Sequence, residues 1–218
     1  MYYDLCTTPE CDLQKIVGIA EKLGCDGLVV IQDQPAKGPN TKVDIVRGVM
    51  ITPKNQFDLR QAVDKFRRKA EIVVAVGGTP DANRMIAETP EVDILSKPFG
   101  ADKLAMDHVI CRASAENNVA VDFCLGDLVH TYKRSRAVLF SKMIKAAKLV
   151  RKYKTPFVIT SGAVTEWDLR SPSELISFGR LLGFQDDAIK DALSGSIAKE
   201  NRKRLSGKWV MPGVEIEK

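Results

Sequence analysis

The sequence is poor in residue types that many functional sites require. Only two of its 218 residues are histidine, His108 and His130, and only 6% are aromatic. Two histidines do not suffice for the His-based ligand set of a metallohydrolase, and no aromatic motif for stacking single-stranded nucleic acid is visible. No acidic residue occurs between Asp127 and Glu166. That run is strongly basic, so any function it has concerns anions.

Paired cysteines and long apolar runs are also missing. The five cysteines are odd in number and scattered, without a C-x-x-C pair; they are Cys6, Cys11, Cys25, Cys111 and Cys124. We interpret them as small core residues in a reducing cytoplasm. No apolar run approaches the ~20 residues of a membrane helix, and the N-terminus leads directly into an expected strand. We therefore expect neither membrane contact nor a signal peptide.

Short β-rich runs alternate with helical patterns along most of the chain. The expected strands are 2–6, 28–31, 45–51, 72–76, 92–96, 119–125 and 155–160, and the expected helices between them are 13–23, 57–69, 82–87, 106–116 and 134–154. This alternation is typical of βα units around a parallel sheet. A doubly wound open sheet would look similar. The even spacing of the units, and the absence of a Gly-rich dinucleotide loop after the first strand, favour a barrel.

The last of these strands leads into a well-marked helix. Ser171 is the expected N-cap, Pro172 suits the first turn, and Glu174 would complete a capping box. Gly183 is expected to end the helix. The expected buried stripe consists of Leu175, Ile176, Phe178, Leu181 and Leu182.

We expect one domain over residues 1–205, followed by a tail over 206–218. The domain should include a further helix over 187–193 and a basic turn at Arg202, Lys203 and Arg204, packed outside the barrel. The tail is expected to be ordered only where Trp209 docks.

The sequence offers little support for protein-based catalysis. Lys97 follows an expected strand, where a barrel lysine can form a Schiff base as in aldolases, but Pro98 indicates an exposed turn. A solvent-facing or phosphate-binding lysine is the preferred interpretation. Ser161-Gly162 lacks a G-x-S-x-G context, and Gly77-Gly78-Thr79 lacks a P-loop, which leaves a tight turn. We predict no catalytic residue in the chain.

Basic residues instead gather on the expected helix 134–154. Its buried face should contain Phe140, Met143, Ala147 and Val150. Lys145, Lys148 and Lys152 repeat along another face, flanked by Lys142 and Arg151. Like charges at this spacing repel each other, and no acidic residue offsets them. An anionic partner explains the pattern better than a merely solvated face, although the latter remains an alternative.

Further cations are expected in loops after strands, the end at which barrels present their functional residues. They are Lys97, His108, His130, Lys133, Arg134 and Arg170. Arg170 is the strongest candidate, because a guanidinium before a helix N-cap can grip a phosphate bidentately. The alternative role of Arg170 is an ion pair with Asp168 or Glu174, and that of His108 is a hydrogen bond with Asp107.

Several motifs together resemble the p30-type protein subunits of ribonuclease P. They are ITSGA followed by WDLRSPSEL and a helix ending LLG, then Met106-Asp107-His108-Val109, and the helix 145–154 running into Thr155-Pro156-Phe157. The resemblance covers most of the chain and is strongest over 107–183. It implies a TIM-like barrel related to the polymerase-and-histidinol-phosphatase fold. Metal-binding relatives of that fold carry Asp-x-His-x-His where this chain has Asp4-Leu5-Cys6.

The resemblance also implies a role in removing the 5′ leader of precursor tRNA. Cleavage would belong to an RNA subunit and its Mg²⁺, with no cofactor or metal on the protein. The expected partners are that RNA, precursor tRNA and protein component 2, in a heterodimer that can pair into a heterotetramer. A catalytically inert scaffold for proteins is the alternative. Residues expected to bind RNA are Lys97, His108, His130, Lys133, Arg134, Arg136, Lys142, Lys145, Lys148, Lys152, Arg170, Arg202, Lys203 and Arg204.

Overall fold

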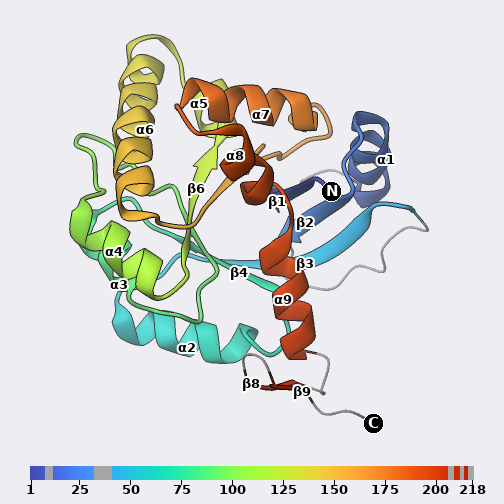
Figure 1. The fold of residues 1–218 in the computed structure, drawn as a ribbon, viewed down its shortest axis with the longest axis horizontal. Coiled ribbons are helices and arrows are strands. Elements are labelled where there is room, and N and C mark those ends of the chain that lie inside the picture. The colour runs from blue at the N-terminus through green and yellow to red at the C-terminus, as the bar shows by residue number, and fades with distance from the viewer. Residues whose placement is uncertain (8–11, 32–40, 206–208, 212–213, 216–218) are drawn as a thin grey trace.

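Seven parallel strands form a nearly closed barrel in the computed structural model, which describes residues 1–7, 12–31, 41–205, 209–211 and 214–215 (Figure 1). The strands are β1 (Tyr3–Thr7), β2 (Gly27–Ile31), β3 (Asp44–Ile51), β4 (Ile72–Val76), β5 (Ile94–Ser96), β6 (Ala120–Cys124) and β7 (Phe157–Thr160). Each strand pairs with the next in chain order. The backbone N–H of Ser161, just after β7, donates to Asp4 Oδ1 of β1 at 3.1 Å, which ties the two ends of the sheet together. The predicted barrel is confirmed.

Helices surround the strands and follow most of them in sequence (Figure 1). They are α1 (Leu13–Leu23), α2 (Gln56–Phe66), α3 (Pro80–Ala87), α4 (His108–Glu116), α5 (Leu125–Val129), α6 (Lys133–Tyr153), α7 (Pro172–Leu181), α8 (Asp186–Ala192) and α9 (Ser196–Leu205). The short helix α5 was not predicted, since residues 119–125 were assigned to the preceding strand as one apolar run. Its first residue, Leu125, begins a turn that carries the chain across the carboxyl end of the barrel towards α6.

Both faces of the strands are buried, as their apolar sequences require. One set of strand residues, including Val29, Ile72, Val74 and Ile94, fills the barrel interior together with Ala198 of α9. The other set packs outward against the helices. Because α9 contributes to the interior cluster, it closes the amino-terminal end of the barrel and leaves the carboxyl ends of the strands as the open face.

Helix α7 confirms the predicted caps. Ser171 and Glu174 form the capping box, and Gly183 has a φ of +86°, a conformation that favours glycine. One stripe residue was predicted wrongly, because Leu181 is 68% exposed. The buried stripe runs through Leu175, Phe178, Gly179 and Leu182, where the missing side chain of Gly179 lets Ile159 and Ile189 approach closely.

The C-terminal part differs from the prediction in two respects, the first being that α9 contributes Ala198 to the interior cluster and does not pack wholly outside the barrel. Second, Arg202, Lys203 and Arg204 form the last turn of α9 and not a separate basic turn. Beyond them, β8 (Trp209–Met211) and β9 (Val214–Glu215) pair in antiparallel fashion. The expected docking of the Trp209 side chain lies outside the described part of the chain, so the boundary of the tail stays a prediction.

Candidate functional site

The open end of the barrel contains a cavity of about 700 Å³, bordered by loops that follow β4, β5, β6 and β7. Its lining includes Lys97, Asp122, Asp127 and His130. Carboxyl ends of parallel strands are the usual location of functional residues in such barrels. This cavity is therefore the first place to look for chemistry.

Asp122 lies at the bottom of the cavity and is fully buried. Burial raises its pKa to about 7, although hydrogen bonds from Thr160 Oγ1 at 2.7 Å and Ser96 Oγ at 2.9 Å oppose the rise. Burial also raises the pKa of Asp127, against the attraction of Lys97 and His130. Within the described residues, no group of three or more His, Cys, Asp or Glu side chains could hold a metal ion. The carboxyl groups here are held by hydroxyls and cations of the chain itself.

Lys97 is exposed at the rim of this cavity. It follows β5 with a φ of +52°, and the nearby charge is the carboxyl group of Asp127. Burial is one way in which a Schiff-base lysine is activated, and Lys97 is exposed. The structure agrees with the preferred interpretation, in which Lys97 faces solvent. The aldolase alternative gains no support.

The glycine turn after β4 is occupied by internal contacts. The N–H of Gly78 donates to Asn83 Oδ1 at 2.9 Å, and Thr79 caps helix α3. The Asn83 amide in turn donates to the carbonyls of Pro98 and Ala105, both at 2.7 Å. This arrangement fits the predicted tight turn, which holds two loops of the open end together.

Cations cluster where α5 leads into α6. His130 lies beside the loop after β7, with its Nε2 at 3.4 Å from Asp168 Oδ1. Lys133 and Arg134 are exposed in the first turn of α6. Arg136 is also exposed, but its guanidinium donates to the carbonyls of Thr131 at 2.5 Å and Val129 at 3.1 Å. The structure thus brings His130, Lys133 and Arg134 together at the open end. The guanidinium of Arg136 instead stabilises the turn between α5 and α6.

The start of α6 is electrostatically unfavourable for the protein alone. Tyr132 is its N-cap and makes no capping hydrogen bond with its side chain, and the first turn contains no acidic residue. A cation at the positive end of a helix dipole costs roughly 0.3–1 kcal/mol. Such an arrangement is expected where an external anion offsets the cost.

Arg170 lies in the loop between β7 and α7. Its Nη1 donates to the carbonyls of Trp167 and Leu169, each at 2.8 Å. Neither alternative ion pair forms as a direct contact; Asp168 accepts from Thr165, and Glu174 accepts from Ser171. Arg170 therefore stiffens its own loop, at the same end of the barrel as His130.

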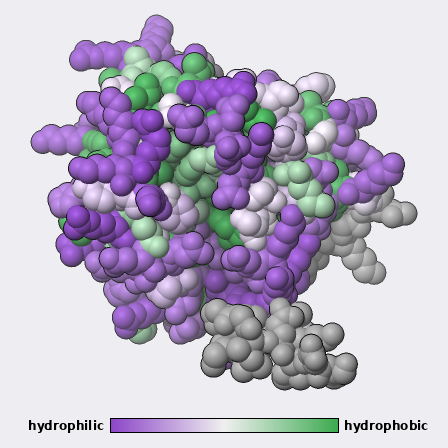
Figure 2. Space-filling view, in the orientation of Figure 1, coloured by the Kyte–Doolittle hydropathy of each residue, from purple (hydrophilic) through white to green (hydrophobic). Residues whose placement is uncertain are grey.

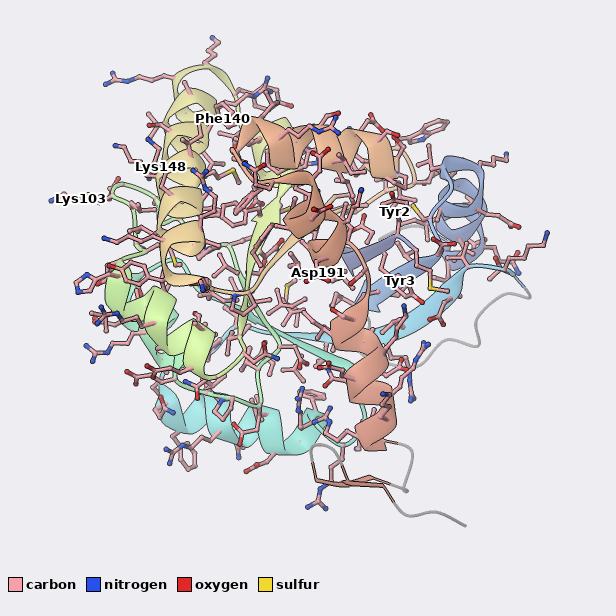
Figure 3. All side chains as sticks on the ribbon, in the orientation of Figure 1. Tyr2, Tyr3, Lys103, Phe140, Lys148 and Asp191 are labelled. Atoms are coloured by element: carbon pink, nitrogen blue, oxygen red, sulfur yellow. The ribbon has the colours of Figure 1, made fainter. Side chains whose placement is uncertain are left out.

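The outer face of α6 carries the predicted lysine stripe. Lys145, Lys148 and Lys152 are all exposed, and Lys148 can be located on α6 in Figure 3. The surface over this helix is mostly hydrophilic in Figure 2. These three ammonium groups are accessible, as an interaction with an extended anion would require.

Lys142 was assigned to this surface wrongly. It is only 7% exposed, and its Nζ donates to the carbonyls of Gly100 at 2.9 Å and Ala101 at 2.6 Å. A lysine on a helix edge can direct its long stem across a neighbouring loop, which sequence spacing does not reveal. Lys142 pins the loop after β5 and is not available to a partner.

His108 lies at the other end of this surface, on the first turn of α4. It is exposed, and Asp107 caps the backbone N–H groups of Val109 and Ile110. The centre of the Tyr153 ring lies 6.4 Å from the centre of the His108 ring. The guanidinium of Arg112 and the ammonium of Lys152 each lie 5.3 Å from the centre of the Tyr153 ring. Arg112 and Tyr153 were not singled out from the sequence, because the packing of α4 against α6 brings them here.

The three basic residues of α9 lie at the opposite, closed end. Arg202 forms ion pairs with Asp44 and Glu71. Burial would raise the pKa of Asp44, but the hydrogen bonds from Arg202 and Tyr3 lower it overall. Arg204 is half-buried. Burial, together with the charge of the nearby Arg67, lowers the pKa of the Arg204 guanidinium. Only Lys203 of the three is exposed. The predicted RNA contacts of Arg202 and Arg204 stay predictions, but the structure gives both side chains a role inside the protein, Arg202 in ion pairs that hold α9 in place and Arg204 in its packing.

Two exposed aromatic residues at the open end were also missed. Trp167 is 77% exposed and Tyr132 is 68% exposed. Both lie in connections between elements, where neither helical nor strand periodicity applies. A tryptophan between two acidic residues in a Ser/Thr-containing loop was the one available signal.

Comparisons with known proteins identify the family to which the chain is similar. The family model described as RNase P subunit p30 matches residues 1–205. The chain is 30% identical over 225 residues to ribonuclease P protein component 3 of Halobacterium salinarum, covering 99% of this chain and 97% of the relative. It is also 30% identical over 227 residues to the component 3 of Methanosarcina mazei, covering 99% and 95%.

A solved structure shares the same fold. A chain in a cryo-EM structure of archaeal ribonuclease P with mature tRNA aligns with a TM-score of 0.86 at 24% identity, covering 98% of both chains. An uncharacterized protein aligns more distantly, with a TM-score of 0.63 at 11% identity, covering 98% of this chain and 77% of the other. Both similarities concern the barrel architecture.

Proposed function

The chain belongs to the RNase P subunit p30 family, and on this premise we propose that it is the barrel-shaped protein subunit of a ribonuclease P, the ribonucleoprotein that removes the 5′ leader of precursor tRNA. Relatives that match over almost their whole length are named ribonuclease P protein component 3. The function is therefore that of a subunit of an endoribonuclease.

The observation that best supports RNA binding is the exposed cationic surface around α6. Lys145, Lys148 and Lys152 extend along the helix, and Lys133 and Arg134 begin it. Phosphates of an RNA backbone would supply the negative charge that this surface lacks. Binding of this kind positions an RNA without reading its sequence.

We assign cleavage to the RNA subunit and its bound Mg²⁺. The protein would bring cations between closely packed RNA helices, lower their mutual repulsion, and so favour the folded RNA at limiting Mg²⁺. Lys97, His108, His130, Arg170 and Lys203 are further candidates for phosphate contacts, since each lies at the protein surface or in a surface loop. No cofactor on the protein is invoked in this role.

Protein component 2 is the proposed protein partner, in a heterodimer that can pair into a heterotetramer. We place the complex in the cytoplasm. The free, buried thiols of Cys25, Cys111 and Cys124 suit a reducing compartment. No helix among the described residues is long and apolar enough to cross a membrane.

The salt dependence of RNA affinity tests this proposal. We expect the affinity of the chain with component 2 for ribonuclease P RNA to fall steeply between roughly 50 and 200 mM monovalent salt, because each neutralised phosphate contributes about 0.7–0.9 to the slope of log K against log salt. Filter binding or fluorescence anisotropy over a salt series measures this slope. A shallow slope would favour the scaffold alternative, in which the barrel contacts only proteins.

A further inference from the structure

Trp167 and Tyr132 are the two most exposed large aromatic side chains at the open end of the barrel, at 77% and 68%. Exposed rings of this size are unfavourable for an isolated soluble protein, because they leave apolar area in water. Phe57 is comparably exposed, at 75%, but it lies in the first turn of α2, outside the α5–α6 and β7–α7 connections that carry Tyr132 and Trp167. The open end is the place where exposed rings and cations coincide.

A direct contact joins the two segments that carry these rings. His130, two residues before Tyr132, lies 3.4 Å from Asp168, which follows Trp167. The Trp167 loop is held further by Thr165, whose N–H and hydroxyl both donate to Asp168 Oδ2 at 2.9 Å. Arg170 binds the carbonyl of Trp167 itself at 2.8 Å. The rings are therefore presented on a backbone that is fixed before any partner arrives.

Cations lie beside the Tyr132 ring, whereas Trp167 stands between the acidic residues Glu166 and Asp168 in the sequence. Lys133 and Arg134 follow Tyr132, and the guanidinium of Arg136 lies 5.6 Å from the centre of its ring. Between residues 128 and 170 the acidic residues are Glu166 and Asp168, and Asp168 is engaged by Thr165 and His130. Fixed aromatic rings within a cationic surface are the two components by which proteins hold single-stranded nucleic acid.

We propose that Trp167 and Tyr132 form a stacking platform for unpaired bases of the RNA, while the neighbouring cations hold the adjoining phosphates. This inference rests on the proposed function and adds that the protein contacts bases as well as backbone. Unpaired nucleotides are the appropriate ligand, because the bases of an A-form helix are already stacked and its major groove is too narrow for side chains. A protein ligand would be expected to bring acidic groups to this surface and to need no RNA.

The test uses the full chain with component 2 and ribonuclease P RNA. Trp167→Ala should weaken RNA binding about tenfold, and Trp167→Phe should retain most of the affinity, because any aromatic face can stack. Tyr132→Ala should act in the same direction. Phe57→Ala is the matched control, an exposed ring of similar size on a different helix, and should leave RNA affinity unchanged. The salt slope of Trp167→Ala should equal that of the wild type, since stacking neutralises no phosphate.

Fluorescence provides an independent measurement. With Trp209→Phe as background, Trp167 is the only tryptophan in the chain, and its emission should be quenched on adding RNA.

If the wild type binds RNA with a steep salt slope but Trp167→Ala binds equally well, the platform is overturned and the proposed function stands. If component 2 without RNA changes the emission and Trp167→Ala weakens that association, the rings dock a protein. If the wild type fails to bind RNA at all, the proposed function fails together with the inference.

Discussion

Replacing Lys145 and Lys148 together by glutamate should weaken binding of ribonuclease P RNA roughly a hundredfold. Both ammonium groups are exposed on α6, in a run without acidic residues, so the substitution removes two attractions and introduces two repulsions. The salt slope should fall by about 1.5, since each lost phosphate contact removes about 0.7–0.9. Precursor-tRNA cleavage should suffer most at low Mg²⁺, where the RNA depends most on protein cations. Binding titrations and cleavage rates over a Mg²⁺ series measure both effects.

Two controls separate this effect from net charge and from loss of folding. Lys15→Glu with Lys22→Glu makes the same charge change at exposed positions of α1, which lies across the barrel from α6 (Figure 1). This variant should retain nearly the wild-type affinity. Lys142→Met removes a lysine from α6 itself, and it should lower stability by roughly 2 kcal/mol through loss of two charged hydrogen bonds without changing the salt slope of the folded protein. An equal loss of RNA binding in the α1 variant would show that α6 is not the site.

Asp122→Asn should stabilise the protein at pH 8 by up to roughly 4 kcal/mol while leaving it almost unchanged near pH 4. Burial raises the pKa of Asp122 from 3.8 to about 7, so between these values the folded state holds a proton that the unfolded state has released. Stability of the wild type must therefore fall as pH rises through this window. Asparagine has the same shape and no charge, and it can keep partners in Thr160 and Ser96. Denaturant unfolding at several pH values measures the difference.

A matched control for this prediction is Asp187→Asn. The Asp187 side chain is fully exposed on α8, so its removal should leave the pH profile of stability unchanged. If Asp122→Asn and the wild type lose stability equally between pH 5 and pH 8, Asp122 is not the group that titrates in this window.

Much of the fold follows from local sequence, because the relevant forces act over a few residues. Strand runs such as 72–76 are apolar and β-branched, and they appear as β4 within the same bounds. Helix α1 begins at Leu13 and ends before Gly24 as its pattern predicts, and the caps of α7 follow from Ser171 and Glu174 alone. Seven such elements in even alternation indicate a parallel sheet covered by helices, but the choice of a barrel over a doubly wound sheet needed the missing dinucleotide loop and the family resemblance as well.

The candidate site was less predictable, because it depends on which chain segments meet. Lys142 and Lys145 look alike in the sequence, yet the loop at Gly100 accepts the hydrogen bonds of only the first. Arg202 appears as part of a basic run until α9 places it against Asp44 of a distant strand. Trp167 belongs to no periodic element, so its exposure emerges only from the path of its loop. Local pattern therefore indicated where cations occur but not which of them remain accessible.

Cleavage of precursor tRNA at low Mg²⁺ by defined mixtures tests the central claim most directly. The mixtures contain this chain alone, the chain with ribonuclease P RNA, and the chain with that RNA and component 2. The account predicts cleavage only where the RNA is present, with the largest stimulation when RNA, component 2 and this chain are combined. Cleavage by the chain alone would contradict it, because the active site would then lie in the protein, and the cavity around Asp122 would be the place to search.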